Sequence, residues 1–490
     1  MLFYDLSQRG DAARYDYLYK CIRHDIAHGV IPAGEKLPSK RALAKHLGVG
    51  VITVEAAYTQ LVAEGYVRAE ERRGYFACEL APAVRAGGAS GDAAFSQREG
   101  QAVPRSAAPL RDETTSQNAA PLQGAATPQT ARGANTARPA HPAFSGSAAT
   151  ALFPYATWAK VMRQTLSEER SQTLAEAASA FGSLRLRRAI ASYLRDYRGM
   201  NVPAERIVVG AGSQTLYQLL IQLLGRGKTY AVEVPGYPLL GEMYRAQDAR
   251  VVEIPITASG IDVDALAASG AEVAHVMPAH QFPTGVVMSA TCRRSLLNWS
   301  REGAGDAGAP LCGRFVIEDD YDAEFRMAGR PIPPLASIDS AGRVIYLNSF
   351  AKSLGAAFRV AYLVLPPALL ARFNDELGFY SNTVSPLEQL ALARFIEQGH
   401  YERHVNRLRA RAKRAQDAVV AALTESDLAE SLSFTGLDGG FHFSAHVEPG
   451  AFREESLQKT VQGCGAQVSA IGPNRYMINF EEAVVAESKA

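Results

Sequence analysis

The chain contains 490 residues, of which 47% are hydrophobic, so it is too long for one ordinary core and has the composition of a globular protein. Its 51 Lys and Arg residues almost balance its 50 Asp and Glu residues. The overall charge therefore excludes a strongly basic protein, and any binding to an anionic partner must depend on a local basic patch. We expect two or three domains.

The sequence contains no recognisable secretion signal and no candidate membrane span. Its first residues lack a basic segment followed by an apolar one, and no later run reaches roughly 18 uninterrupted apolar residues. The five cysteines lie far apart without a CxxC pair, which argues against a disulfide framework and against a zinc site. We expect a cytoplasmic protein without a metal site.

Composition changes sharply between residues 85 and 142, where Ala, Gly, Ser, Pro, Gln and Thr dominate and large apolar residues almost disappear. No helical or strand period is found there, which is typical of a flexible linker. We predict a small domain over residues 1–81, a linker over residues 82–145 and a large domain over residues 146–490.

The small domain is predicted to contain three helices and a hairpin. Helical spacing of apolar residues spans residues 15–28, and two further helices are predicted at residues 40–47, after the N-cap Ser39, and at residues 53–64. Residues 66–80 then resemble two short strands with a tight connection. This order predicts a winged helix-turn-helix, in which the second helix of the pair enters the major groove.

Basic residues gather at two places in this domain, at the start of the second helix and on the hairpin. The clusters are Lys36, Lys40, Arg41 and Lys45, and Arg68, Arg72 and Arg73. Charged residues often only solvate the surface of a small three-helix bundle. The wing together with both clusters favours DNA binding, with the basic side chains on phosphates or in a minor groove.

The segments LPSKRALAKHLGV, TVEAAYTQL and AEGYV resemble the GntR-type winged-helix domain through almost the whole module. The resemblance implies operator binding as a dimer. Gly50 and Val51 stand where the family commonly has a polar or basic pair. The remaining candidates for DNA contacts are Lys40, Arg41, Thr53, Arg72, Arg73 and Gly74.

Strands and helices alternate after residue 153. Apolar runs that predict strands lie at residues 206–212, 229–234, 249–256, 271–278, 315–320, 344–349 and 361–366. The alternation predicts an α/β domain with a mostly parallel sheet and helices on both faces. Ligands of such sheets gather beyond the carboxyl ends of the strands.

Polar residues follow several of these predicted strands. In VVGAGSQTL, Ser213 lies where a helix begins, and a helix N-terminus can bind a phosphate, although the glycines could equally serve a tight turn. Asp319 and Tyr321 should point to one side of the chain, and Asp320 and Asp322 to the other. The acidic stretch could also be a solvated strand end or, with less support, a cation site.

Lys352 follows another predicted strand, with Ser349 before it and Arg359 after it. A half-buried lysine can form a Schiff base with an aldehyde, although a single lysine in a loop is usually only a surface residue. A phosphate loop, an Asp/Tyr pair, a lysine and an arginine at strand ends together fit pyridoxal 5'-phosphate.

The segments GAGSQTLYQLL, VPGYPLL, MPAHQFPTG, EDDYDAEFR, YLNSFAKSL and FIEQGHYERHVNRLR, behind a GntR-type domain, resemble the MocR family of regulators. The large domain of that family is similar to aminotransferases of fold type I, with a smaller C-terminal α+β subdomain. The resemblance implies a Schiff base on Lys352, pairing of Asp319 with the pyridine nitrogen, contact of Tyr321 with the ring hydroxyl and Tyr237 against the ring. It implies a phosphate site made by Gly212, Ser213, Gln214, Ser349 and Arg359.

Three positions depart from the related proteins. The stretch AASAFG before and including Gly182 lacks a tyrosine that would reach the cofactor of the partner subunit. Phe282 precedes Pro-Thr-Gly where plain aminotransferases often have asparagine, a form typical of the regulators. Met477 stands where an arginine often binds a substrate carboxylate, and Arg475, on the same face of the predicted strand, is a candidate replacement.

Two functions follow from this combination. The first is a transcriptional regulator that binds operator DNA and senses an amine, an amino acid or pyridoxal phosphate itself, in a head-to-tail homodimer as the family implies. The second is an aminotransferase with an attached DNA-binding module, for which the lysine, aspartate and tyrosine would permit a transamination half-reaction. A scaffold in which Lys352 never binds cofactor is a third reading. The intact winged helix favours the regulator.

Overall fold

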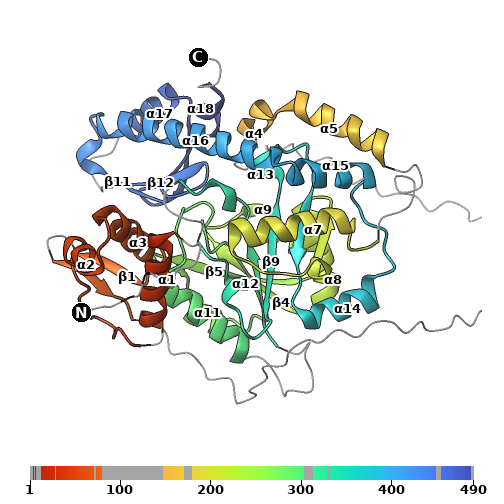
Figure 1. The fold of residues 1–490 in the computed structure, drawn as a ribbon, viewed down its shortest axis with the longest axis horizontal. Coiled ribbons are helices and arrows are strands. Elements are labelled where there is room, and N and C mark those ends of the chain that lie inside the picture. The colour runs from red at the N-terminus through yellow and green to blue at the C-terminus, as the bar shows by residue number, and fades with distance from the viewer. Residues whose placement is uncertain are drawn as a thin grey trace, which may run out of the picture. The chain divides into compact units, whose positions relative to one another are not determined.

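The computed structural model describes residues 4, 6, 13–27, 29–70, 73–79, 147–169, 179–302, 313–327, 332–448 and 454–486. The predicted linker, residues 82–145, lies outside these described residues, and so does Arg72. Figure 1 shows the arrangement of the described helices and strands. Among them, no helix combines the length and the apolar character needed to cross a membrane.

The N-terminal domain has the predicted three helices and a hairpin. The elements are α1 (Arg14–Ala27), α2 (Lys40–Leu47), α3 (Val51–Ala63), β1 (Val67–Glu70) and β2 (Gly74–Ala77). The strands pair antiparallel, with Val67 opposite Ala77. Ser39 caps α2 as predicted, because its hydroxyl oxygen accepts the backbone N–H of Ala42 at 3.2 Å. Apolar residues of all three helices meet in one core, which confirms the winged helix-turn-helix.

An eight-stranded sheet forms the centre of the large domain, in the order β3-β10-β9-β8-β7-β4-β5-β6. The pairs β9–β8, β8–β7, β7–β4 and β4–β5 are parallel, which confirms a mostly parallel sheet. In chain order the strands are β3 (Ile207–Gly210), β4 (Thr229–Val234), β5 (Arg250–Thr257), β6 (Gly260–Ile261), β7 (Val273–Val276), β8 (Phe315–Asp319), β9 (Val344–Ser349) and β10 (Ala361–Val364).

Strand β10 runs antiparallel to both of its neighbours, β9 and β3. Only the short helix α13 (Ala351–Leu354) lies between β9 and β10. A parallel return needs a crossover of about a dozen residues or more, usually with a longer helix, so this short connection favours the reversed strand. The reversal leaves Lys352 on the turn between two buried strands.

Helices cover both faces of this sheet, because successive side chains of its strands alternate between two cores. On β8, Phe315 and Ile317 pack under one set of helices, and Val316 packs under another. The first set is α8 (Ser213–Leu224), α9 (Pro238–Arg245) and α14 (Pro367–Leu377). The opposite face carries α7 (Leu184–Tyr193), α10 (Val263–Ala268), α11 (Ala290–Glu302), α12 (Leu335–Ile338) and α15 (Pro386–Glu397), with α5 (Tyr155–Glu168) packed on α15.

The C-terminal part forms the predicted smaller α+β subdomain around a four-stranded antiparallel sheet of order β11-β12-β14-β13. Its strands are β11 (Leu432–Thr435), β12 (His442–Val447), β13 (Gln467–Gly472) and β14 (Arg475–Asn479). The long helix α16 (His400–Thr424) packs against α17 (Glu454–Gly463) and α18 (Glu481–Ala486) (Figure 1). The helix α4 (Ser147–Leu152) joins the same core through Ala148 and Ala149.

Candidate cofactor and DNA-binding sites

Polar residues from four elements lie at the carboxyl ends of the parallel strands, as the sequence predicts. Asp319 is the last residue of β8, and Ser349 is the last residue of β9, the neighbouring parallel strand. Tyr237 precedes α9, and Ser213 begins α8. This edge of the sheet is where α/β proteins bind their ligands.

Asp319 is buried, yet its charge is only partly compensated. Its Oδ2 accepts a hydrogen bond from the Tyr217 hydroxyl at 2.5 Å and lies 3.4 Å from His275 Nε2. Burial and this carboxylate raise the pKa of Tyr217 well above its usual range, so the phenol remains a donor. The second oxygen, Asp319 Oδ1, is buried without a hydrogen-bond partner in the part of the chain that the structure describes. A protonated pyridine nitrogen has the donor and the charge that fit this oxygen.

A cradle for an anionic group lies at the start of α8. Gly212 has φ +84°, and a Cβ there would overlap the guanidinium of Arg359, so the position favours glycine on two counts. The unpaired N–H groups of the first turn of α8 and the guanidinium therefore border one space. Gln214, on that turn, donates to Tyr237, and the pKa of Tyr237 is raised by burial and by the Asp319 carboxylate. These residues fit the predicted phosphate and ring positions.

Lys352 is largely buried on α13, and 12% of its side chain is exposed. Its Nζ lies 3.3 Å from Oε2 of Glu481, at the start of α18, and 5.6 Å from the ring centroid of Phe441. The Ser349 hydroxyl accepts the backbone N–H of Ala351 at 3.2 Å, which fixes the turn that carries the lysine. The predicted semi-buried lysine is therefore present, with a carboxylate partner from the C-terminal subdomain.

Tyr321 is buried in a small apolar cluster with Met277, Phe282 and Met477. Its hydroxyl lies 3.3 Å from His280 Nδ1. Met477 therefore places its apolar side chain beside Tyr321, the residue predicted to contact the cofactor ring. Related proteins often have a carboxylate-binding arginine at the position of Met477, so this chain has an apolar side chain there instead.

The prediction that Asp322 faces away from Tyr321 is wrong. Asp322 Oδ2 lies 2.7 Å from His280 Nδ1, the same nitrogen that the Tyr321 hydroxyl approaches. Strand β8 ends at Asp319 and the chain turns, so the strict alternation of an extended segment holds for Asp319 and Asp320 but not beyond them. Asp320 does face the opposite side, where its Oδ2 accepts hydrogen bonds from Arg198 and from the Tyr346 hydroxyl.

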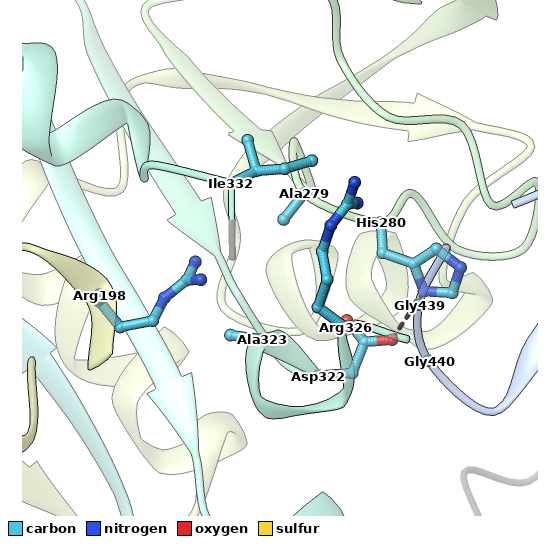
Figure 2. A pocket seen from close by; sticks show the side chains of 9 residues that line it. All are labelled: Arg198, Ala279, His280, Asp322, Ala323, Arg326, Ile332, Gly439 and Gly440. Atoms are coloured by element: carbon cyan, nitrogen blue, oxygen red, sulfur yellow. Dashed lines mark hydrogen bonds and ion pairs between the residues drawn. The ribbon is translucent and has the colours of Figure 1, made fainter. Parts of the chain in front are cut away.

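A small cavity borders His280 (Figure 2). Figure 2 shows the bond between His280 and Asp322 at its edge and the side chains of Arg198 and Arg326 near it. The cavity holds about 20 Å³, which admits roughly one water molecule. It is too small for an organic effector. Its complete lining is Arg198, Ala279, His280, Asp322, Ala323, Arg326, Ile332, Gly439 and Gly440.

Arg475 lies on β14 two positions before Met477, as the sequence indicates. Arg475 pairs across the sheet with His446, whereas Met477 pairs with Ser444. Arg475 is half-buried, and Met477 is buried. The role of Arg475 as a carboxylate-binding residue stays a prediction.

Sequence reasoning missed Tyr217, His275 and Glu481. Tyr217 follows Ser213 by four positions on α8, so helical spacing places both side chains on one face and could have identified it. His275 lies on β7, next to β8 in the sheet, and its selection needs the strand order. Glu481 comes from the C-terminal subdomain, and no local pattern links it to Lys352.

The candidate DNA contacts lie on α2, α3 and the hairpin. Lys40 is held 2.5 Å from Glu55, and Arg73 is held 2.5 Å from Glu70, so both cations are partly compensated within the domain. The side chain of Arg41 is exposed, and Thr53 is half-buried in the first turn of α3.

The start of α3 presents apolar rather than polar groups. Gly50 is the N-cap residue, and Ile52 in the first turn is 80% exposed. A large apolar side chain exposed to this extent at the start of a recognition helix suits contact with a thymine methyl group in the major groove. Gly74 begins β2 with φ +112° and lies against the side chain of Lys36.

Two protein families match the chain. The gntR family of bacterial regulatory proteins matches residues 14–76. The aminotransferase class I and II family matches residues 149–292 and 315–471, which together make up more than half of the chain.

Solved aminotransferases share the fold of the large domain. The multiple substrate aminotransferase of Thermococcus profundus superimposes with a TM-score of 0.55 at 24% identity, over 69% of this chain and 86% of that protein. The α-aminoadipate aminotransferase LysN of Thermus thermophilus gives a TM-score of 0.54 at 23% identity, over 68% and 86%. The predicted aminotransferase-like fold is confirmed.

Curated relatives are similar through both domains. The uncharacterized HTH-type transcriptional regulator YhdI of Bacillus subtilis is 32% identical over 92% of this chain and 87% of YhdI. The probable rhizopine catabolism regulatory protein MocR of Rhizobium meliloti is 30% identical over 95% and 88%. The pyridoxine biosynthesis regulator PdxR of Corynebacterium glutamicum is 27% identical over 86% and 80%. The chain therefore belongs to the MocR type of the GntR family, transcriptional regulators with a helix-turn-helix domain and an aminotransferase-like domain.

Proposed function

We propose that this regulator binds pyridoxal 5'-phosphate on Lys352 and changes its affinity for operator DNA when an amine or amino acid competes for the cofactor aldehyde. The observation that carries the proposal is the placement of Asp319 at the end of β8 and of Lys352 just after the end of β9, the neighbouring parallel strand. Asp319 offers a buried carboxylate oxygen to a ring nitrogen, and Lys352 offers an amine to an aldehyde.

The other residues would bind and orient the cofactor. Gly212, Ser213 and Gln214 would direct N–H groups and side-chain donors at the phosphate, together with Ser349 and Arg359. Tyr237 would pack on the ring, and Tyr321 would donate to the ring hydroxyl because its pKa is raised well above the usual range by burial and by Asp322. When bound, pyridoxal phosphate supplies an aldehyde that exchanges one amine for another.

The winged helix would supply DNA binding as a homodimer, in a head-to-tail arrangement of the large domains. Lys40, Arg41 and Arg73 would contact phosphates, and Thr53 and Ile52 would approach base edges. Regulation requires that the effector bind two states of the protein with different affinity, which couples the two sites by about 1–3 kcal/mol in typical allosteric proteins. The effector class is an amine, and Arg475 is the candidate for binding a carboxylate on it.

The DNA part is tested with a fragment of the promoter upstream of the gene for this protein. Replacing Arg41 and Arg73 by alanine should weaken binding and lower the salt slope of the binding constant by about 2, one unit for each lost phosphate contact. Arg226 and Lys459, exposed on the large domain, provide the matched double-alanine control. Equal salt slopes in both double variants would contradict the assignment.

The cofactor part is tested by adding pyridoxal phosphate to the full chain on the same DNA. Operator affinity should change by about 5-fold to 150-fold, the range of ordinary allosteric coupling, and Lys352→Ala should abolish that response while still binding DNA. An equal response in Lys352→Ala would refute the role of the lysine. Steady formation of a keto acid from an amine donor would favour the aminotransferase instead.

A further inference from the structure

We propose that Glu481 is a positioning residue that binds the amine of Lys352 whenever that amine is not bonded to the cofactor, and so favours displacement of the lysine by an effector. The proposal rests on the proposed function of Lys352. It assigns to the C-terminal subdomain a direct part in effector sensing, because Glu481 begins α18 whereas Lys352 lies on α13.

The contact between Lys352 and Glu481 is buried, and a backbone hydrogen bond fixes the position of Glu481. Lys352 Nζ and Glu481 Oε2 are 3.3 Å apart, and their side chains are 12% and 1% exposed. The backbone N–H of Glu481 donates to Asn479 Oδ1 at 3.0 Å, which fixes the start of the helix and the direction of the carboxylate. An ion pair with this degree of burial is screened much less by solvent than a surface pair.

A titratable neighbour of Lys352, His442, supports the choice of Glu481. His442 on β12 is fully buried, and its pKa is lowered well below the usual range by burial, by His280 and by Lys352. A neutral imidazole does not compete with Lys352 for the carboxylate. Glu481 forms a buried ion pair with Lys352.

Lys352 cannot form its full ion pair with Glu481 and be bonded to the cofactor aldehyde at the same time. As an ammonium, Nζ carries three hydrogens and a positive charge for the carboxylate. When Nζ bonds to the aldehyde carbon, water leaves and the nitrogen keeps at most one hydrogen. When an effector R–NH₃⁺ displaces the lysine, a new carbon–nitrogen bond to the effector forms, the bond to Nζ breaks, and the two protons lost by the effector amine pass to Lys352. The regenerated ammonium then returns to Glu481.

Opposite effects on two binding equilibria follow from this competition. The pair with Glu481 opposes the attachment of Lys352 to the cofactor and favours its displacement. Replacing Glu481 by glutamine removes the pair, so the apoprotein should bind pyridoxal phosphate about tenfold more tightly. The holoprotein should need about tenfold more amine for displacement. A purely structural role would weaken both equilibria.

The pair lies on two elements that both contact helix α4. Helix α4 packs on both α13 and α18. It contacts α13 closely, since a Cβ on Gly355, the residue that ends α13, would overlap Thr150 of α4. Helix α4 is also the first helix that the structure describes after residue 79. Lys352 and Glu481 therefore lie on two elements that contact the first described helix after the predicted linker.

The test uses the full chain, its Glu481→Gln variant and the matched control Glu482→Gln, which alters the exposed next residue of α18. The dissociation constant of pyridoxal phosphate is measured on the apoproteins. Displacement on the holoproteins is followed by absorbance with methylamine, a probe without a carboxylate. Glu481→Gln should shift the two equilibria in opposite directions, about tenfold each, Glu481→Asp should restore part of both shifts, and the control should shift neither.

Shifts in the same direction, or no shift in either equilibrium, would overturn the proposal. A thermal melt of each apoprotein separates misfolding from lost pairing, because Glu481→Gln is expected to lower the melting temperature and still to unfold in one cooperative transition. If the unaltered chain fails to bind pyridoxal phosphate at all, the proposed function itself is wrong. That outcome is seen before any variant is compared, so the two failures are distinguishable.

Discussion

Asp319 and Asp320 are adjacent buried carboxylates at the end of one strand, and they have opposite surroundings. Asp320 is paired with the buried guanidinium of Arg198 and accepts a hydrogen bond from the Tyr346 hydroxyl. Asp319 has a tyrosine hydroxyl and an imidazole as partners, and its Oδ1 is left open among the described residues. Alternation at the end of β8 therefore places Asp320 in a buried ion pair and Asp319 on the face where we propose that the cofactor binds.

The largest expected effect is on the Asp320 side. Asp320→Asn removes the anion opposite a guanidinium whose side chain is 2% exposed, so Arg198 would be left as a buried unpaired charge. Breaking such a pair costs about 3–5 kcal/mol of unfolding free energy, measured by urea denaturation. Asp319→Asn serves as the control and should cost less than about 1 kcal/mol, because the amide oxygen can still accept the hydrogen bond of the Tyr217 hydroxyl. Equal losses in both variants would break the comparison.

Glu324 is a buried carboxyl near Asp320 and Arg198. The second expected effect is its contribution to the pH dependence of the unfolding free energy. Its carboxylate accepts hydrogen bonds from Tyr193 and Tyr401 at 3.3 Å, and burial raises its pKa from 4.5 to about 7. Between pH 4.5 and 7 the Glu324 carboxyl is therefore mostly protonated in the folded state and mostly ionised in the unfolded state. Stability contributed by this group falls as pH rises through that window, by about 3 kcal/mol in all.

Glu324→Gln keeps a neutral group of the same shape and should remove this slope. The variant should match the unaltered protein near pH 4.5 and exceed its unfolding free energy by up to about 3 kcal/mol at pH 8. Urea denaturation at a series of pH values between these limits measures the difference. Parallel pH curves for the two proteins would show that Glu324 is charged throughout, contrary to the account.

The third effect concerns the ligand side and should leave stability nearly unchanged. Asp319→Asn replaces a charged acceptor for the pyridine nitrogen by a neutral group. Loss of one charge-assisted hydrogen bond should weaken pyridoxal phosphate binding by about 10-fold to 100-fold, measured by titration of the apoprotein. Asp320→Asn, studied where it remains folded, is the control. Unchanged cofactor affinity in Asp319→Asn would remove Asp319 from the site.

Sequence patterns predicted the parts of the site that follow strands. Ser213, Asp319 and Lys352 lie where a predicted strand ends, and the parallel sheet brings those ends together. The same reasoning predicted the winged helix, because its helices carry clear apolar faces and caps. These features depend on local patterns of apolar and capping residues, which can be recognised in a single sequence.

Contacts between distant segments could not be predicted in this way. The pairing of Lys352 with Glu481 joins residues 129 positions apart, and that of Arg198 with Asp320 joins residues 122 apart. Both require the packing of elements from different parts of the chain. The failed prediction for Asp322 has a local cause, since extended geometry was assumed past the last residue of β8.

The most direct test of the central claim is to locate the cofactor on the chain. Holoprotein prepared with pyridoxal phosphate is reduced with borohydride, which fixes a Schiff base as a stable secondary amine, and is digested for peptide mass spectrometry. We expect a phosphopyridoxyl group on Lys352 alone, and none at that position in Lys352→Ala. Attachment to a different lysine, or the absence of any labelled peptide, would contradict this claim.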